Sequence, residues 1–157
     1  MSRDTTFSET AAALGINFDG EIKLGGNYVA LARDGHHVYV SGQVPRVGSE
    51  VVVTGRAGSD VTLAQAQLAA KICALRALAL LQRSLGSLDK VRAILKVNVF
   101  TQSAEDFTQL SEVADAASEL LHEVLGAQAG AHARTSVGVF QLPKNATVEL
   151  DLVAVLD

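Results

Sequence analysis

The sequence has little cysteine and no cluster of basic residues. A single cysteine, Cys73, occurs in 157 residues, which excludes an internal disulfide. Its place in a long apolar segment predicts a small buried hydrophobic side chain rather than a nucleophile. Acidic residues outnumber basic ones by 17 to 13, and no run of lysine or arginine occurs. The chain therefore lacks the electrostatic surface that binds a phosphate backbone, and we expect no nucleic-acid partner.

Linkers, leader-like segments and metal-ligand spacings are also missing. No segment rich in proline, glycine and serine divides the chain, so residues 1–157 are expected to form a single domain. Three charged residues occur among the first nine, without an apolar run of 18 residues, which predicts a cytoplasmic protein with no membrane association. His36, His37 and His122 show no metal-ligand spacing, so we expect no metal and no cofactor.

The first third of the chain predicts a polar arm followed by a β-hairpin. Residues 1–20 are polar with scattered alanine and are expected to form a loosely ordered arm with a short helix at 9–14. Two candidate strands, 28–32 and 37–43, are joined by a loop in which Asp34-Gly35 is a strong hairpin signal. A third, short β segment or structured loop is expected at 50–53.

The middle of the chain predicts two long helices separated by a buried strand. Thr62 and Gln65 form a Thr-x-x-Gln capping box, and the helical pattern continues to Gly86. Residues 91–100 are apolar on both faces, as in a strand covered on both sides. Ser103 is predicted as the N-cap of a second helix that ends before Gly126.

The last 26 residues, 132–157, predict two strands around the turn Leu142-Pro143-Lys144-Asn145. Pairing of these strands as a hairpin would bring Arg134 close to Glu149. A guanidinium fixed on a strand suits the carboxylate of a small substrate. An Arg–Glu ion pair that stiffens the hairpin is equally compatible with the spacing.

The resulting order, β-β-(β)-α-β-α-β-β, predicts an α+β fold in which two long helices pack on one face of a mixed sheet. Two helices cover one face only, yet several strands carry apolar residues on both faces. We therefore expect another copy of the chain to cover the second face in a symmetric homo-oligomer. Binding sites would then lie in clefts where subunits meet.

Several motifs occur in a characteristic order and spacing. They are Tyr28 placed thirteen residues before Ser41 of Ser41-Gly42-Gln43-Val44-Pro45, Lys96-Val97-Asn98-Val99-Phe100 with Asp106-Phe107, Ala133-Arg134-Thr135-Ser136-Val137, and Leu142-Pro143 with Val148-Glu149-Leu150. Together they resemble the RidA/YjgF-type family of reactive-intermediate (imine) deaminases, long labelled L-PSP endoribonucleases, from about Gly26 to Val155. The resemblance implies a chorismate-mutase-like fold and a homotrimer with three interfacial clefts.

The resemblance also implies roles for individual residues. Arg134 would hold the carboxylate of a 2-imino or 2-enamino acid, and Glu149 would position or activate the attacking water. The chain departs from many deaminases in having Ser136 in place of a cysteine and Ser111 in place of an asparagine. A longer connection at 125–132 adds to these departures, and together they indicate a divergent branch.

Further residues are candidates for binding a small carboxylate. Tyr28 either closes over the ligand or packs in an interface, while Ser41 and Gly42 offer hydroxyl and backbone groups or simply end a strand. Phe100, Ser111 and Ser136 complete the expected binding set, and His132 beside Arg134 is a possible acid or base.

Three functions are compatible with these residues. Deamination of imines is the leading hypothesis, and a non-catalytic module that holds a small carboxylic metabolite is the alternative. A ribonuclease is disfavoured by the acidic balance and by the lack of a histidine pair or metal cluster.

Overall fold

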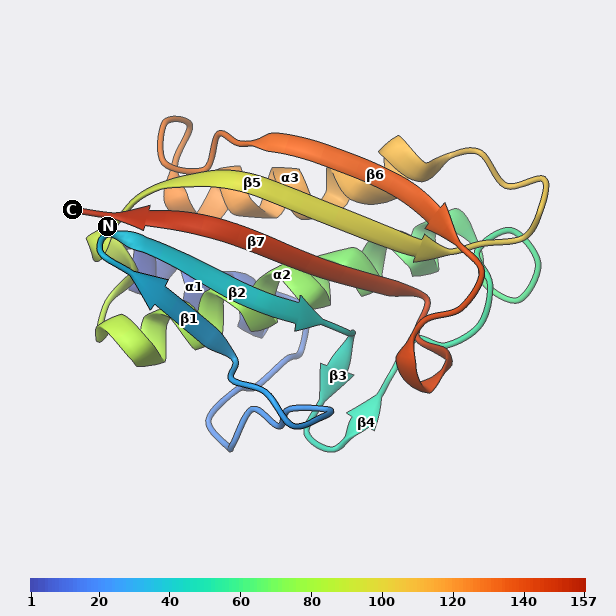
Figure 1. The fold of residues 1–157 in the computed structure, drawn as a ribbon, viewed down its shortest axis with the longest axis horizontal. Helices are drawn as coiled ribbons and strands as arrows, with labels where there is room; N and C mark the ends of the chain where they lie inside the picture. The colour runs from blue at the N-terminus through green and yellow to red at the C-terminus, as the bar shows by residue number, and fades with distance from the viewer.

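Five strands form one mixed sheet in the computed structural model, which describes residues 1–157 (Figure 1). Their spatial order is β1-β2-β7-β5-β6, and every neighbouring pair is antiparallel except the parallel pair β5 and β6. The strands are β1 (Leu31–Asp34), β2 (His37–Gln43), β5 (Val91–Gln102), β6 (Ala133–Val139) and β7 (Val148–Leu156). Two shorter strands, β3 (Arg46–Val47) and β4 (Glu50–Val51), form a separate ribbon.

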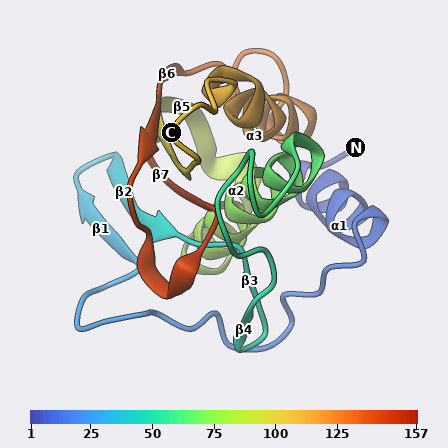
Figure 2. The same ribbon diagram turned by 90° about the vertical axis from the view of Figure 1, so that its right-hand side faces the viewer.

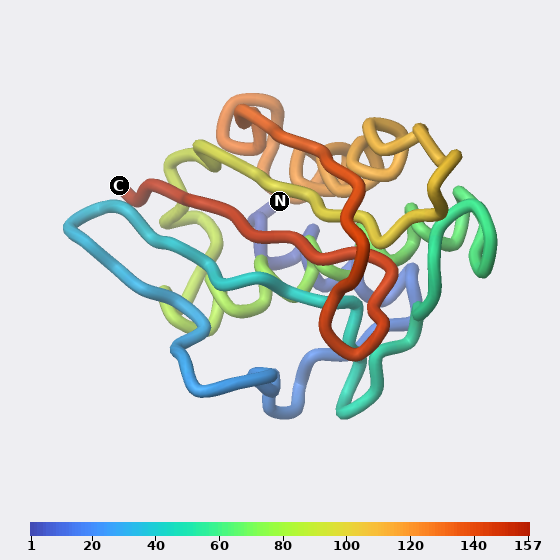
Figure 3. Tube along the Cα trace, turned by 45° about the vertical axis from the view of Figure 1, so that its right-hand side comes forward, coloured from blue at the N-terminus to red at the C-terminus, as the bar shows by residue number.

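The predicted C-terminal hairpin is wrong. Both strands exist, but β7 lies between β2 and β5, while β6 is an edge strand that pairs only with β5 (Figure 3). A short 3-10 helix, Pro143–Asn145, occupies the expected turn, and Lys144 and Asn145 there have positive φ angles of 58°. Because β5 separates β6 from β7, the strands that carry Arg134 and Glu149 do not touch.

Two long helices cover one face of the sheet, which confirms the predicted α+β layout (Figure 2). Helix α2 (Leu63–Leu85) begins at the predicted capping box, in which Thr62 Oγ1 accepts from the backbone N–H of Gln65, and it ends at Gly86 in the left-handed region. Its length and apolar composition would suit a membrane-crossing helix. Most of its side chains are instead buried between the sheet and α3, which accounts for them without a membrane.

Helix α3 (Leu110–Leu125) has Gln109 as its N-cap, six residues later than the predicted N-cap Ser103. Ala104 N–H donates to the carbonyl of Ala57, and Phe107 N–H donates to the carbonyl of Ala104, so this segment is held against the 56–61 loop and makes a turn before the helix. Phe107, expected on the helix, packs against Gly58 instead, where a Cβ would lie 2.9 Å from the Phe107 side chain. The apolar stripe of α3 faces the core as predicted.

The N-terminal arm is more ordered than its composition suggests. Helix α1 (Arg3–Ala13) is longer than the predicted 9–14 segment and packs on the outer side of α2 and α3 (Figure 2). Burial alone would raise the pKa of Asp4, but hydrogen bonds from Ser87, Leu88 and Gln82 outweigh it and lower that pKa. These bonds tie the start of the chain to the end of α2.

The second face of the sheet has no helix over it (Figure 2). Residues of β7 at even positions, such as Leu150, are buried against the helices, so odd positions such as Glu149 point to the uncovered face. Tyr39 and Val137 are 50% and 39% exposed there. These exposed apolar side chains are the reason for expecting a second copy of the chain to cover this face.

Candidate functional site

A small pocket surrounds Glu149 where β2 ends. It has a volume of about 160 Å³ and is lined by the segments 23–28 and 42–46, by Arg76 of α2 and by the turn at Pro143-Lys144. Gly42 packs directly on the Glu149 carboxylate, since a Cβ at that position would lie 2.1 Å from Glu149 Oε1. Glycine at position 42 allows this close approach; the group that approaches is a side chain, whereas the sequence suggested a ligand or another backbone.

The Glu149 carboxylate makes no hydrogen bond to any other residue and no ion pair. Its pKa is raised by burial and by the neighbouring carboxylate of Asp151, which is itself held by Asn98 Nδ2 at 2.8 Å. A half-buried carboxyl with a raised pKa and free oxygens can accept a proton from a bound water. The family resemblance implied this role for Glu149, and the role stays a prediction.

Tyr28 and Ser41 differ in how they meet this pocket. Tyr28 lies before β1, is 49% exposed and lines the pocket. The Ser41 hydroxyl donates to the carbonyl of Val29 at 2.7 Å, and Ser41 N–H donates to Ala30. Ser41 thus fixes the segment that carries Tyr28, and its hydroxyl is already engaged.

Four basic residues also line the pocket, and none was predicted from the sequence. Arg76 is 3% exposed and its guanidinium donates to Gln43 Oε1, to the carbonyl of Arg46 and to the carbonyl of Lys23. Arg46, Lys23 and Lys144 complete the set. The signal in the sequence was Arg76 itself, a lone charge within the apolar run Ile72 to Leu81 of a core helix.

Arg134 lies on the other face of the sheet, so the predicted proximity to Glu149 within one chain is wrong. Arg134 pairs in register with the buried Val97, whereas Glu149 pairs with Phe100. Two strand spacings and three residues along β5 place their Cα atoms roughly 14 Å apart. Arg134 Nη1 instead forms an ion pair with Asp115 Oδ1 of α3 at 2.8 Å.

A hydrogen-bonded group surrounds Arg134. Arg134 Nη1 also donates to Ser118 Oγ at 3.0 Å, and Ser118 Oγ lies 2.8 Å from His132 Nε2. His132 Nδ1 is 2.6 Å from the carbonyl of Gly130; since a carbonyl can only accept, Nδ1 carries the proton and Ser118 donates to Nε2. Burial lowers the pKa of His132, and nearby His122 and Arg134 lower it further, against the opposing effect of Gly130.

The remaining predicted residues fall into two groups. Ser111 and Ser136 lie on the Arg134 side, and the Ser111 carbonyl is 3.5 Å from Arg134 Nη2. Phe100 lies on the uncovered face beside Glu149. The predicted set is therefore divided into an Arg134 surface and a Glu149 pocket.

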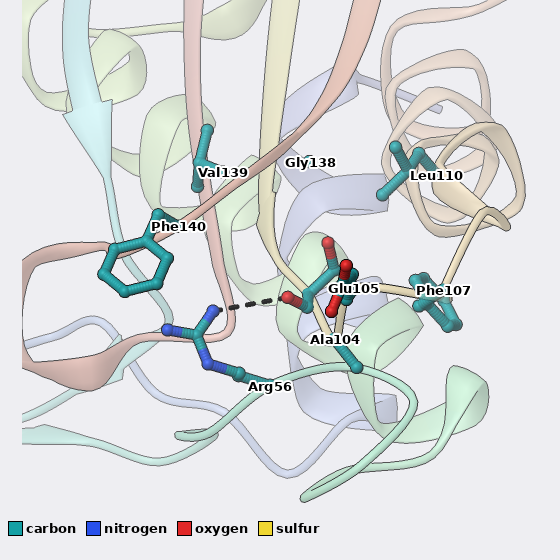
Figure 4. Close-up of a pocket in the computed structure, with 9 residues that line it drawn as sticks. Arg56, Ala104, Glu105, Phe107, Leu110, Gly138, Val139 and Phe140 are labelled. Carbon is teal, nitrogen blue, oxygen red and sulfur yellow. Dashed lines mark hydrogen bonds between the residues drawn. The ribbon is translucent and has the colours of Figure 1, made fainter.

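The largest cavity lies elsewhere, at the ends of β5 and β6 (Figure 4). It has a volume of about 620 Å³, and the Arg56 guanidinium sits 4.9 Å from the centre of the Phe140 ring and donates to the carbonyl of Ser103. Gly138 lines it, where a Cβ would approach Ser103 Oγ to 2.8 Å. No three His, Cys, Asp or Glu side chains lie close enough together to hold a metal ion.

Fold and motifs together define a family. The sequence model of the family described as endoribonuclease L-PSP matches residues 20–156, and the chain belongs to this family, which includes the RidA/YjgF proteins. The chain is 40% identical to Protein TCP17 of Trypanosoma cruzi over 144 residues, covering 92% of this chain and 90% of that protein.

Two further relatives place the chain within the family. It is 29% identical over 133 residues to a 2-iminobutanoate/2-iminopropanoate deaminase of Dermatophagoides farinae, covering 84% of this chain and 88% of that protein. It is also similar to the crystal structure of Atu1372 from Agrobacterium tumefaciens, a protein of unknown function, with a TM-score of 0.88 and 37% identity over 99% of this chain and 96% of that one.

Proposed function

We propose that the protein hydrolyses reactive 2-imino and 2-enamino acids to 2-keto acids and ammonia. The observation that carries this proposal is the Glu149 carboxyl, which has a raised pKa, no hydrogen-bond partner and direct access to a small pocket. Membership of the family and the relative named as an imine deaminase support the same reaction class.

The chemistry needs two groups. The substrate carboxylate would bind Arg134, whose Nε and much of Nη2 are left free by Asp115 and Ser118. Glu149 would take a proton from water as the water oxygen bonds to C2, and would give that proton to the imine nitrogen. It would then transfer the proton of the new C2 hydroxyl to the same nitrogen as the C–N bond breaks, which leaves the 2-keto acid and ammonia. Each 1.4 kcal/mol by which positioning lowers the barrier gives about a tenfold rate increase.

The division of these groups between two surfaces supports a site completed between copies. Arg134 lies on an edge strand whose outer side is unpaired, and Glu149 lies on the sheet face that no helix covers. We propose that the chain forms a homotrimer in which the Arg134 surface of one copy meets the Glu149 pocket of the next. Sedimentation equilibrium should give the mass of a trimer. The mass of a monomer at the concentration used for activity assays would contradict this arrangement.

The function is tested by making imines in situ with an amino-acid oxidase and trapping those that survive with semicarbazide. The wild type should lower the yield of trapped imine, and Arg134→Ala and Glu149→Gln should each abolish the effect. Arg33→Gln, which removes a guanidinium bonded only to the carbonyl of Gly35, is the matched control and should behave as wild type. Saturable binding of a 2-keto acid without turnover would identify a binding protein instead.

A further inference from the structure

Arg76 is a buried cation without a counter-ion. Arg76 is only 3% exposed, and all three hydrogen bonds of its guanidinium are donated to neutral oxygens of Gln43, Arg46 and Lys23. Burial, together with the nearby charge of Arg46, lowers the pKa of Arg76 to about 10. A buried charge that is solvated but not neutralised is costly unless an anion accompanies it.

Arg46 is the second unusual cation of the pocket. Its Nε is buried and has no hydrogen-bond partner, although buried polar atoms are nearly always paired in native proteins. Lys144 stands at the rim with its backbone in the left-handed region (φ 58°, ψ 26°), a conformation that a lysine adopts only when the surrounding structure holds it. Lys23 lies across the same opening.

Glu149 does not neutralise these cations. It makes no ion pair with any of them, and its free oxygens lie against Gly42. Four basic side chains and one acidic side chain thus line this small pocket, although the formal net charge of the chain is −4. The pocket is therefore rich in positive charge in a protein that is acidic as a whole.

We propose that this pocket binds a second anionic group of the ligand, held by Arg46 and Lys144 and stabilised by the buried charge of Arg76. The ligand is then a small organic acid with two carboxylates. Resting on the proposed function, this assigns as substrate a 2-imino dicarboxylic acid, whose 2-carboxylate binds Arg134 and whose distal carboxylate enters the pocket. The volume of about 160 Å³ is below the about 300–1,000 Å³ of drug-sized sites, which suits a short arm that ends in one carboxylate.

Binding is tested without catalysis by NMR titration of the full-length protein with succinate and butanoate, which share four carbons and differ in one carboxylate. Succinate should bind at least tenfold more tightly than butanoate. Arg46→Gln and Lys144→Gln should each weaken succinate binding about 10- to 100-fold, the effect of one charge-assisted hydrogen bond. Arg33→Gln should leave it unchanged.

Two results would overturn the assignment. Equal affinity for succinate and butanoate would show that no second carboxylate is recognised. Tighter binding of inorganic phosphate than of succinate, lost in Arg46→Gln, would show that the anion is a phosphate and not an organic acid.

Turnover separates this inference from the proposed function. The imines of glutamate and norvaline have five carbons each and differ in the distal carboxylate. The wild type should hydrolyse the glutamate imine at least tenfold faster at low concentration, and Arg46→Gln should remove that preference. Succinate binding without acceleration of any imine would refute the deaminase function alone. Acceleration of both imines equally, unaffected by Arg46→Gln, would refute the dicarboxylate pocket alone.

Discussion

Substitution of Gly42 by alanine provides a sharp test of the Glu149 pocket. The new Cβ would lie 2.1 Å from Glu149 Oε1 and 3.0 Å from Cδ. Real Cβ contacts are essentially never shorter than 3.0 Å, so the carboxylate must retreat by at least about 0.9 Å. A displacement of about 1 Å from a productive geometry costs on the order of 100-fold in rate.

The same change should leave the fold nearly as stable as before. Gly42 does not have a positive φ, so alanine fits the backbone and restricts the unfolded chain, a gain of about 0.4–1 kcal/mol. Rotation of the flexible Glu149 side chain offsets part of this gain. We expect the free energy of unfolding in guanidinium chloride to change by less than about 1 kcal/mol.

The two measurements are made on the same preparations. Gly20→Ala is the matched control, because a Cβ there meets no atom within 4 Å. The expected result is a 10- to 100-fold loss of imine hydrolysis in Gly42→Ala, with stability near that of the wild type and of Gly20→Ala. Full activity in Gly42→Ala would refute the role given to the position of the Glu149 carboxylate.

Three further predictions concern charge and packing. Glu149→Gln should raise the free energy of unfolding at pH 7, because the raised pKa of Glu149 means that folding opposes its ionisation. This gain should vanish below about pH 4, where the carboxyl is protonated in both the folded and the unfolded state. A lower free energy of unfolding for the variant at pH 7 would contradict the prediction. Asp115→Ala should lower the free energy of unfolding by at most about 1 kcal/mol, because it removes a partly exposed ion pair. The same change frees Arg134 and should tighten butanoate binding in NMR titrations. Weaker binding would show that Asp115 positions the guanidinium. Leu121→Ala should cost about 2–5 kcal/mol in denaturant unfolding, since Leu121 is fully buried, and a cost below about 1 kcal/mol would place it outside the core.

Local signals in the sequence predicted the elements of the fold well. The capping box at Thr62, the stop at Gly86 and the hairpin at Asp34-Gly35 all depend on neighbouring residues, and the structure confirms them. The predicted start of α3 was wrong because the backbone N–H of Ala104 is bonded to Ala57, which is distant in sequence, and this contact delays the helix. Such contacts leave no periodic trace in the sequence.

The strand order could not be predicted from spacing. Consecutive strands joined by a short turn usually pair, and that rule gave the incorrect hairpin between β6 and β7. The parallel pairing of β5 with β6 follows from the crossover through α3, which returns the chain to the edge of the sheet. The placement of Arg134 and Glu149 on opposite faces follows from the register, which pairs Arg134 with Val97 and Glu149 with Phe100, an odd number of residues apart on β5.

The candidate site was predicted in part. The motifs identified Gly42 and Glu149, and the structure brings these two together. They did not identify Arg46 and Arg76, because their juxtaposition depends on the packing of α2 against the segment after β2. A lone arginine in an apolar helix run was the trace that this packing left in the sequence.

The position of β7 also governs how the sheet can assemble during synthesis. Residues 148–156 join β2 to β5, and no other strand connects the β1–β2 hairpin to the β5–β6 pair (Figure 3). Until the ribosome has released those residues, the growing chain holds two separate β-ribbons with open edges, both prone to pairing with other chains. Chaperone dependence should therefore be greatest just before the final strand emerges.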